Sequence, residues 1–316
     1  MQHAVQLFLG PGLARYGFGE GHPFGPDRMD AFWQEALRQE LDKRVSIGVP
    51  VMANREAIMC FHTPEYIDRV IERSESGSGY LDYGDTPAFK GIYKAAATVV
   101  GTVLAAAEEA INGSHSRCFI PIAGLHHARR NMAAGFCVFN DAGVLIETLR
   151  SRYGIKRIAY VDIDAHHCDG VFYAFETDPD LCIVDIHEDG AHLYPGTGFT
   201  DETGKGVAKG TKLNLPMRPG ANDDDFLRAW PEAESFIRTL FKPEFIIFQC
   251  GADSIDGDPI TDMRFTPQAY AHAAASLCRI ADEFSKGRII ALGGGGYNRA
   301  NLAKGWCAVL SAFIDS

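Results

Sequence analysis

Short apolar runs alternate with longer segments of helical periodicity along the whole chain. Each run is continuous, of strand length and mostly β-branched or aromatic, as is typical of strands buried on both faces of a parallel sheet. The predicted strands are Val5–Leu9, Cys118–Ile122, Arg157–Ile163, Leu181–Ile186, Phe245–Cys250 and Ile289–Leu292. The alternation predicts a doubly wound α/β fold with helices on both faces of the sheet.

The segments between these strands carry helix start and stop signals. Thr266 can cap a helix over Pro267–Phe284, and Gly287 follows as a stop. The segment Phe89–Asn112 is rich in Ala and Val. The other predicted helices are Arg28–Leu41, Asp141–Arg150, Asp223–Leu240 and Arg299–Phe313. No repeat or linker interrupts the pattern, so we expect one domain over residues 1–316.

Composition narrows the class of protein. The chain has 316 residues and a net charge of −11, which disfavours a general affinity for nucleic acid. An acidic surface attracts cationic substrates, although solubility alone also accounts for it. No apolar run reaches the roughly 18 residues of a membrane span, and Met1–Gly10 lacks the basic start of a signal peptide. Eight scattered cysteines favour free thiols, so we expect a cytoplasmic protein without membrane or nucleic-acid partners.

Four of the predicted strands end in polar or glycine-rich segments. In doubly wound folds, ligands bind outside the carboxyl ends of the strands, and those ends meet at one edge of the sheet. The four segments are Gly124–His127, Asp162–Gly170, Gly251–Asp253 and Gly293–Asn298. We expect them to converge on one site.

Asp164, His166 and Asp253 are candidate metal ligands. Asp164 and His166 stand two residues apart after a strand and therefore project to the same side. Asp253 follows another strand and completes a set of three nitrogen and oxygen ligands, which leaves a coordination position open, as in catalytic zinc sites. A lone Asp-x-His is more often a strand cap or an ion pair, but four polar strand ends together favour the metal.

His126 and His127 are candidate acid–base groups beside that metal. Two adjacent histidines after a strand are harder to explain as packed or surface residues than one. Asp162 and Asp169 flank the metal-ligand segment, and each could accept a ring N–H from one histidine. The pairing would raise the basicity of the imidazole.

Tyr297 follows the four consecutive glycines Gly293–Gly296. Such a run could cradle a phosphate, although its spacing matches neither a P-loop nor a dinucleotide fingerprint. It could equally give the backbone the freedom to aim Tyr297 at the metal, where a phenol donates a hydrogen bond to an oxyanion. The residues alone leave both interpretations open.

Taken together, these segments resemble the motifs of the histone deacetylase superfamily, which includes bacterial acetoin-utilisation deacetylases and acetylpolyamine amidohydrolases. The resemblance covers nearly the whole chain in family order. The four main motifs are Gly124–Asp141, Tyr160–Val171, Gln249–Pro259 and Leu292–Asn298. Weaker matches are Gly21–Arg28, Phe61–Thr63 and Tyr83–Pro87.

The resemblance implies an arginase/deacetylase fold with an eight-stranded, mostly parallel sheet. It also implies zinc, or ferrous iron, on Asp164, His166 and Asp253. By the same resemblance His127, paired with Asp169, is the main general base and acid, and His126, paired with Asp162, assists electrostatically. Tyr297 stabilises the oxyanion.

Further site residues follow from the resemblance alone. Asp85 would hold the substrate at the rim, and Gly135, Phe136, Tyr194 and Ile260 would line the tunnel. Arg28 would lie in an internal cavity beneath the metal. Family members often bind potassium through backbone carbonyls, which correspond here to Asp162, Asp164 and His166.

The chain departs from the family pattern at several positions. Cys168 replaces the usual glycine, Asp185 replaces a serine that often helps to bind potassium, and Tyr194 replaces the commoner tunnel phenylalanine. Ile260 stands where one group of polyamine deacetylases has a glutamate.

We therefore expect a zinc-dependent deacetylase that releases acetate from an N-acetylated or acylated amine. The substrate is either acetyl-lysine in proteins or a small acetylated amine, and a dedicated acetylpolyamine amidohydrolase is the alternative. An arginase-type ureohydrolase is disfavoured because its Asp-Ala-His-x-Asp run is one residue shorter than Asp164–Asp169. An inactive acyl-lysine binder is disfavoured by His127 and Tyr297. The sequence gives no indication of the oligomeric state.

Overall fold

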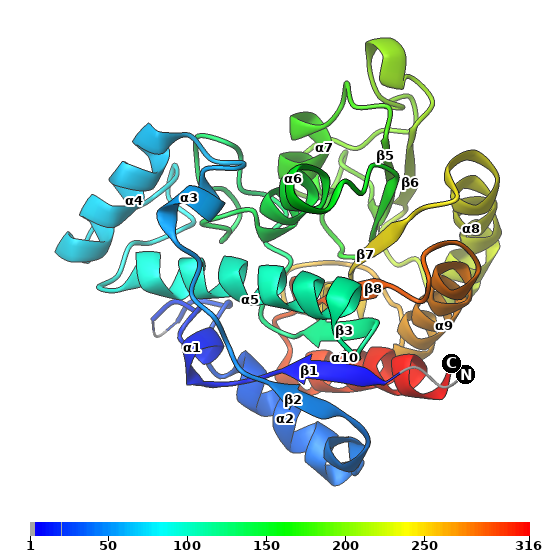
Figure 1. The fold of residues 1–316 in the computed structure, drawn as a ribbon, viewed down its shortest axis with the longest axis horizontal. Coiled ribbons are helices and arrows are strands. Elements are labelled where there is room, and N and C mark those ends of the chain that lie inside the picture. The colour runs from blue at the N-terminus through cyan, green and yellow to red at the C-terminus, as the bar shows by residue number, and fades with distance from the viewer. Residues whose placement is uncertain (1–3, 20) are drawn as a thin grey trace.

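The computed structural model describes residues 4–19 and 21–316. Eight strands of this part of the chain form one sheet in the order β2-β1-β3-β8-β7-β4-β5-β6, and every neighbouring pair is parallel (Figure 1). The strands are β1 Val5–Phe8, β2 Ser46–Gly48, β3 Arg117–Ile120, β4 Ile158–Asp162, β5 Leu181–Glu188, β6 Lys212–Met217, β7 Phe245–Gln249 and β8 Ile289–Leu292. The predicted fold class is confirmed, and the sheet is parallel throughout rather than mostly parallel.

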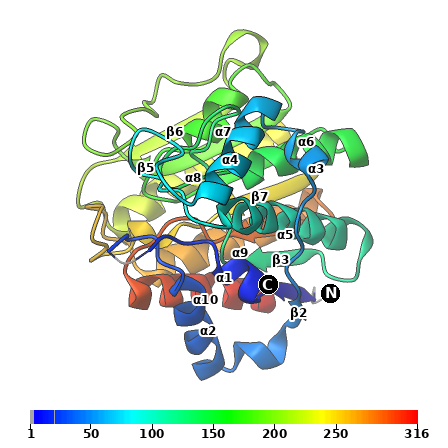
Figure 2. The same ribbon diagram turned by 90° about the vertical axis from the view of Figure 1, so that its left-hand side faces the viewer.

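Helices flank the sheet in two groups (Figures 1 and 2). One group contains α5 with α4 and α6, and the other contains α2, α9 and α10. The α-helices are α1 Pro11–Ala14, α2 Arg28–Arg38, α3 Arg55–Ile58, α4 Pro64–Ser76, α5 Ile92–Asn112, α6 Asp141–Tyr153, α7 Asp169–Ala174, α8 Asp223–Phe236, α9 Pro267–Phe284 and α10 Arg299–Asp315. Short helical turns are η1 Leu41–Arg44, η2 Gly206–Ala208, η3 Ile237–Phe241 and η4 Ala252–Ser254.

The two strands that the sequence pattern missed, β2 and β6, are the two edges of the sheet. An edge strand has a partner on one side only and need not be apolar throughout. The sequence of β6, Lys-Leu-Asn-Leu-Pro-Met, alternates polar and apolar residues and contains Pro216, which an edge tolerates. The pattern of continuous apolar runs therefore identifies the inner strands and overlooks the edges.

The helix predictions differ from the structure mainly at the ends. The helix predicted to reach Leu41 ends at Arg38, and the one predicted from Phe89 begins at Ile92. The helix α4 was missed because most of its residues are polar, although Thr63 accepts a hydrogen bond as its N-cap. Its buried face consists of Tyr66, Ile67 and Val70.

In the described part of the chain, no helix is both long and apolar enough to cross a membrane. The cytoplasmic location stays a prediction. All eight cysteines have free thiols, and Cys60 is the one that is exposed. The fold brings β3, β8, β7 and β4 side by side at the centre of the sheet, and these are the strands whose ends the sequence singled out.

Candidate active site

The polar segments after three of these strands, β3, β4 and β8, line one cavity. Its volume is about 260 Å³. The residues that line it are Asp85, His127, Gly135, Phe136, His166, Leu193, Tyr194, Ile260 and Tyr297. The five substrate-site residues expected from the sequence therefore share this cavity with a metal-ligand candidate, a histidine of the pair and the tyrosine. Leu193 was not expected there.

The three candidate metal ligands lie together at the base of the site. One donor atom from each of Asp164, His166 and Asp253 lies within 4.8 Å of the others. Nδ1 of His166 is 3.1 Å from Asp164 Oδ1 and 3.2 Å from Asp253 Oδ2. Burial, together with the nearby charge of Asp164, raises the pKa of Asp253 to about 7. Two buried carboxylates this close favour a cation between them, so the residues fit a divalent metal.

Backbone and amide donors hold these carboxylates in place. Asp164 Oδ2 accepts hydrogen bonds from Gln249 Nε2 at 2.9 Å and from the Gly295 amide at 2.8 Å. Asp253 Oδ1 accepts one from the Ala165 amide at 2.9 Å. A Cβ atom at Gly295 would collide with Asp253 Oδ2, which explains why glycine is required there. The ligands are therefore fixed by groups that a metal would not displace.

Each histidine of the pair is bonded to a different aspartate. His126 Nδ1 lies 2.8 Å from Asp162 Oδ2, and His127 Nδ1 lies 2.7 Å from Asp169 Oδ1. The two Nε2 atoms are 3.1 Å apart, and both rings are buried. The aspartates thus occupy the Nδ1 atoms, which leaves Nε2 of each ring as the atom that can exchange a proton.

The two adjacent histidines have opposite pKa shifts. Burial and the nearby charge of His126 lower the pKa of His127 to about 4. Burial also acts to lower the pKa of His126, but the charges of Asp162 and Asp164 raise it to about 9. These shifts favour the neutral form of His127, which can accept a proton, and the charged form of its neighbour His126.

Tyr297 is presented to the cavity by the glycine run. The run curls through Gly294 and Gly296, whose φ values are +66° and +117°, a region that favours glycine. Asp258 Oδ2 accepts the Tyr297 amide at 2.8 Å. Burial and the charge of Asp253 keep the pKa of Tyr297 well above its ordinary value, so the phenol stays protonated. In this geometry an amide of the run donates to an aspartate, and the tyrosine is the group aimed at the cavity.

Arg28 supports the same glycine run from below. Its Nε donates to the Gly296 carbonyl at 2.9 Å and its Nη2 to the Gly294 carbonyl at 2.6 Å. The guanidinium is fully buried and lies 4.0 Å from the centre of the Phe24 ring. The structure therefore places Arg28 against the backbone behind Tyr297, and an internal cavity around it stays a prediction.

The cavity wall combines a strained backbone with aromatic rings. Gly135 and Phe136 both have a positive φ, and the φ of 69° at Phe136 is unusual for a residue other than glycine. Tyr16 holds this turn by donating from its hydroxyl to the Phe136 carbonyl at 2.7 Å. The Tyr194 ring centre lies 5.1 Å from that of His127, and 46% of Tyr194 is exposed. The wall is mostly apolar, which suits an alkyl chain.

Three residues support the site without having been predicted to do so. Gln249 contacts Asp164, and Asp258 anchors Tyr297. Asp141 accepts hydrogen bonds at 2.7 Å from the amides of Gly124 and Leu125, just before the histidine pair. All three residues fall inside the motifs that the sequence singled out, which was the available signal. Their roles depend on contacts that only the fold creates, with backbone amides for Asp141 and Asp258 and with the Asp164 carboxylate for Gln249.

The chain matches a deacetylase family and two named relatives over nearly its whole length. The family model described as Histone deacetylase domain matches residues 22–313. The acetoin utilization protein AcuC of Bacillus subtilis (strain 168) is 36% identical over 311 residues, which cover 94% of this chain and 78% of that protein. Histone deacetylase 6 of Arabidopsis thaliana is 30% identical over 313 residues, which cover 96% of this chain and 65% of that protein.

A solved structure of the same family has the same fold as this chain. A crystal structure of the HDA15 HD domain superposes with a TM-score of 0.90 at 25% identity, covering 99% of this chain and 90% of that one. The family implies a divalent metal, and the Asp164, His166 and Asp253 cluster can hold one. The chain belongs to the histone deacetylase family and is a deacetylase, a hydrolase that acts on an acetylated substrate.

Proposed function

We propose that this deacetylase hydrolyses the amide of an N-acetylated amine with a zinc ion held by Asp164, His166 and Asp253. The observation that carries the proposal is the shared cavity. A metal-ligand candidate (His166), a neutral imidazole (His127) and a protonated phenol (Tyr297) all line it. These are the groups that amide hydrolysis needs at one carbonyl.

When bound, zinc would polarise the acetyl carbonyl and lower the pKa of a water. Nε2 of His127 takes a proton from the attacking water, because its Nδ1 is fixed by Asp169. His126, positively charged beside it, stabilises the negative charge that develops. The Tyr297 hydroxyl donates a hydrogen bond to the oxyanion, and a protonated histidine then gives its proton to the leaving amine.

The walls of the cavity would bind the acyl chain and its carrier. Phe136, Gly135 and Tyr194 contact the alkyl part, and Asp85 at the exposed rim binds an amide or ammonium group. Ile260 adds an apolar contact where a carboxylate would bind a second amine. We therefore expect N-acetyl-lysine in a peptide to be a better substrate than a small acetylated diamine.

Two further parts of the proposal rest on the family resemblance. Residues 1–316 would act as one catalytic domain. A potassium ion would bind the backbone carbonyls of Asp162, Asp164 and His166, near the departures at Cys168 and Asp185.

A kinetic panel tests the proposed function. Metal content is measured first, and zinc is the expected ion, with ferrous iron as the alternative. The kcat/KM values are then compared for an acetyl-lysine peptide, acetylcadaverine and acetylputrescine. Acetate release from the peptide, exceeding that from both diamines, supports the proposal. Higher kcat/KM for a diamine would indicate a polyamine amidohydrolase, and tight peptide binding without acetate release would indicate an inactive binder.

A further inference from the structure

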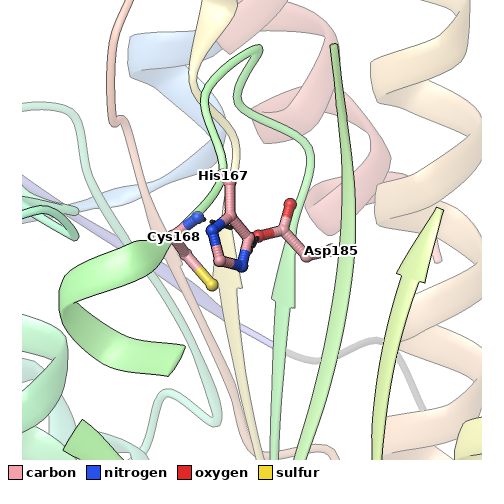
Figure 3. Close-up of side chains that lie close together, drawn as sticks. All are labelled: His167, Cys168 and Asp185. Carbon is pink, nitrogen blue, oxygen red and sulfur yellow. Dashed lines mark hydrogen bonds and ion pairs between the residues drawn. The ribbon is translucent and has the colours of Figure 1, made fainter. Parts of the chain in front are cut away.

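A second group of ligand-type side chains lies beside the catalytic segment. It consists of His167, Cys168 and Asp185, the last on β5 (Figure 3). One donor atom from each, the Cys168 Sγ included, lies within 4.8 Å of the others. His167 Nε2 is 3.9 Å from Asp185 Oδ2. None of the three lines the active-site cavity, so the group is distinct from the cluster of Asp164, His166 and Asp253.

The buried imidazole of His167 has one ring nitrogen, Nε2, without a hydrogen-bond partner among the described residues. The side chain is fully buried. Nδ1 is held by Thr197 Oγ1 at 2.8 Å. When Nδ1 carries the ring proton, it donates to Thr197 and leaves the Nε2 lone pair free. A buried lone pair without a donor is unfavourable unless a cation takes it.

The Asp185 carboxylate is held just as firmly. Its Oδ2 accepts the Cys168 amide at 2.8 Å, and its Oδ1 is 2.9 Å from His187 Nδ1. The other ring nitrogen of His187 lies 2.9 Å from the Gly198 carbonyl. The supporting contacts therefore orient two of the three donors from outside the cluster, as they do around known metal ligands.

We propose that His167 Nε2, Cys168 Sγ and a carboxylate oxygen of Asp185 bind one divalent transition-metal ion of the zinc class. Donors on a tetrahedral zinc lie roughly 3.3–3.7 Å apart, so the side chains need only a small movement. The thiol releases its proton to solvent as the thiolate binds. A thiolate and a carboxylate together neutralise the two charges of the ion, which suits a fully buried site.

The donor chemistry separates this site from a potassium site. Potassium binds hard oxygen ligands, whereas a thiolate and an imidazole select softer transition metals. The cysteine and the aspartate are the two residues that depart from the family pattern of glycine and serine. The inference does not depend on the proposed function, since it involves none of the three ligands assigned to the catalytic zinc.

Metal stoichiometry tests the inference. The full chain is produced in zinc-supplemented medium, dialysed against metal-free buffer and analysed for zinc per chain. The wild type is expected to hold about two ions, and both Cys168→Gly and Cys168→Ser about one. The matched control is Cys182→Ser, which alters a different buried cysteine, located on β5. This variant is expected to keep about two zinc ions.

Cobalt gives an independent readout. The cobalt-loaded wild type and Cys182→Ser are expected to show a thiolate-to-metal charge-transfer band that both Cys168 variants lack. Circular dichroism establishes that each variant is folded, and Cys168→Gly introduces the residue usual in the family. A single zinc ion in the wild type, or a stoichiometry that Cys168→Gly leaves unchanged, would overturn the inference. The variant Asp253→Ala is expected to lose the catalytic ion and to keep the ion of His167, Cys168 and Asp185. This result would distinguish two separate sites from an arginase-type paired site.

Discussion

Two buried clusters of ligand-type residues come from the same short segment and differ in what they face. His166 lines the active-site cavity, whereas its neighbour His167 points into a closed group with Cys168 and Asp185. Both clusters contain an imidazole and at least one carboxylate. The segment after β4 bends at residues 164–166, and its two adjacent histidines belong to different clusters, so one segment can serve an open and a closed site.

The clusters differ in one ligand, a cysteine in place of an aspartate, and in their access to the cavity. The open cluster shares its cavity with His127 and Tyr297, and these groups can act on a substrate. His167, Cys168 and Asp185 do not line that cavity, and an ion bound by them would stabilise the segment that carries Asp164, His166 and Asp169. The cavity gives a substrate access to the open cluster, whereas the closed cluster is buried away from it.

The largest expected effect comes from removing a ligand of the open cluster. Asp253→Ala should lose the catalytic ion and reduce kcat/KM by roughly a thousandfold or more, because a three-ligand site cannot spare one ligand. Elemental analysis and acetate release measure both outcomes. The ion of the closed cluster should remain. Full metal occupancy together with wild-type turnover would refute the ligand assignment.

Next in size is the loss of the phenol that faces the open cluster. Tyr297→Phe should retain the metal and lose about 10²–10³ in kcat, because one oxyanion donor is removed. Single-turnover kinetics and metal analysis on the same sample check this. Unchanged turnover would take Tyr297 out of the mechanism.

A smaller effect is expected at the residue that follows Cys168. Asp169 acts to raise the pKa of His127 against the effect of burial, so Asp169→Asn should lower that pKa further below about 4. Activity requires neutral His127, which is present above its pKa, so the acidic limb of the kcat profile should move to lower pH. The weaker base should also reduce kcat by roughly 10–100-fold. A limb that moves to higher pH would contradict the pairing.

The smallest expected effect concerns the closed cluster. Cys168→Gly should lower the melting temperature of the zinc-loaded protein, because an ion that binds only the folded state stabilises it. A domain of this size loses roughly 2–4 °C per kcal/mol. Calorimetry of the variant beside Cys182→Ser measures the change. Equal melting temperatures in the two variants would mean that the closed cluster contributes no metal-linked stability.

Much of the fold was predictable because the inner strands are buried on both faces and are therefore apolar throughout. All six strands with continuous apolar runs are present, and the two missed strands are the edges. The helix α4 was missed because its apolar face is narrow and its other residues are charged or polar. Pattern arguments therefore succeed where burial is complete and fail where an element is half exposed.

The candidate site likewise has a part that the sequence predicted and a part that it did not. The placement of Asp164, His166 and Asp253 follows from residues after strand ends, since parallel strands end at one edge. The anchoring contacts of Asp141, Gln249 and Asp258 did not follow, because each binds a group at least 16 residues away in the chain.

The sequence by itself determined which strands form the centre of the sheet and which residue types follow them. It also determined the family, because the motifs and their order are features of the amino-acid sequence. Only the tertiary structure decided which neighbours meet. The order β3-β8-β7-β4 sets the distances between donor atoms, and packing decides that His166 faces a cavity while His167 faces Asp185. Those distances depend on contacts between residues far apart in the chain, which no local pattern encodes.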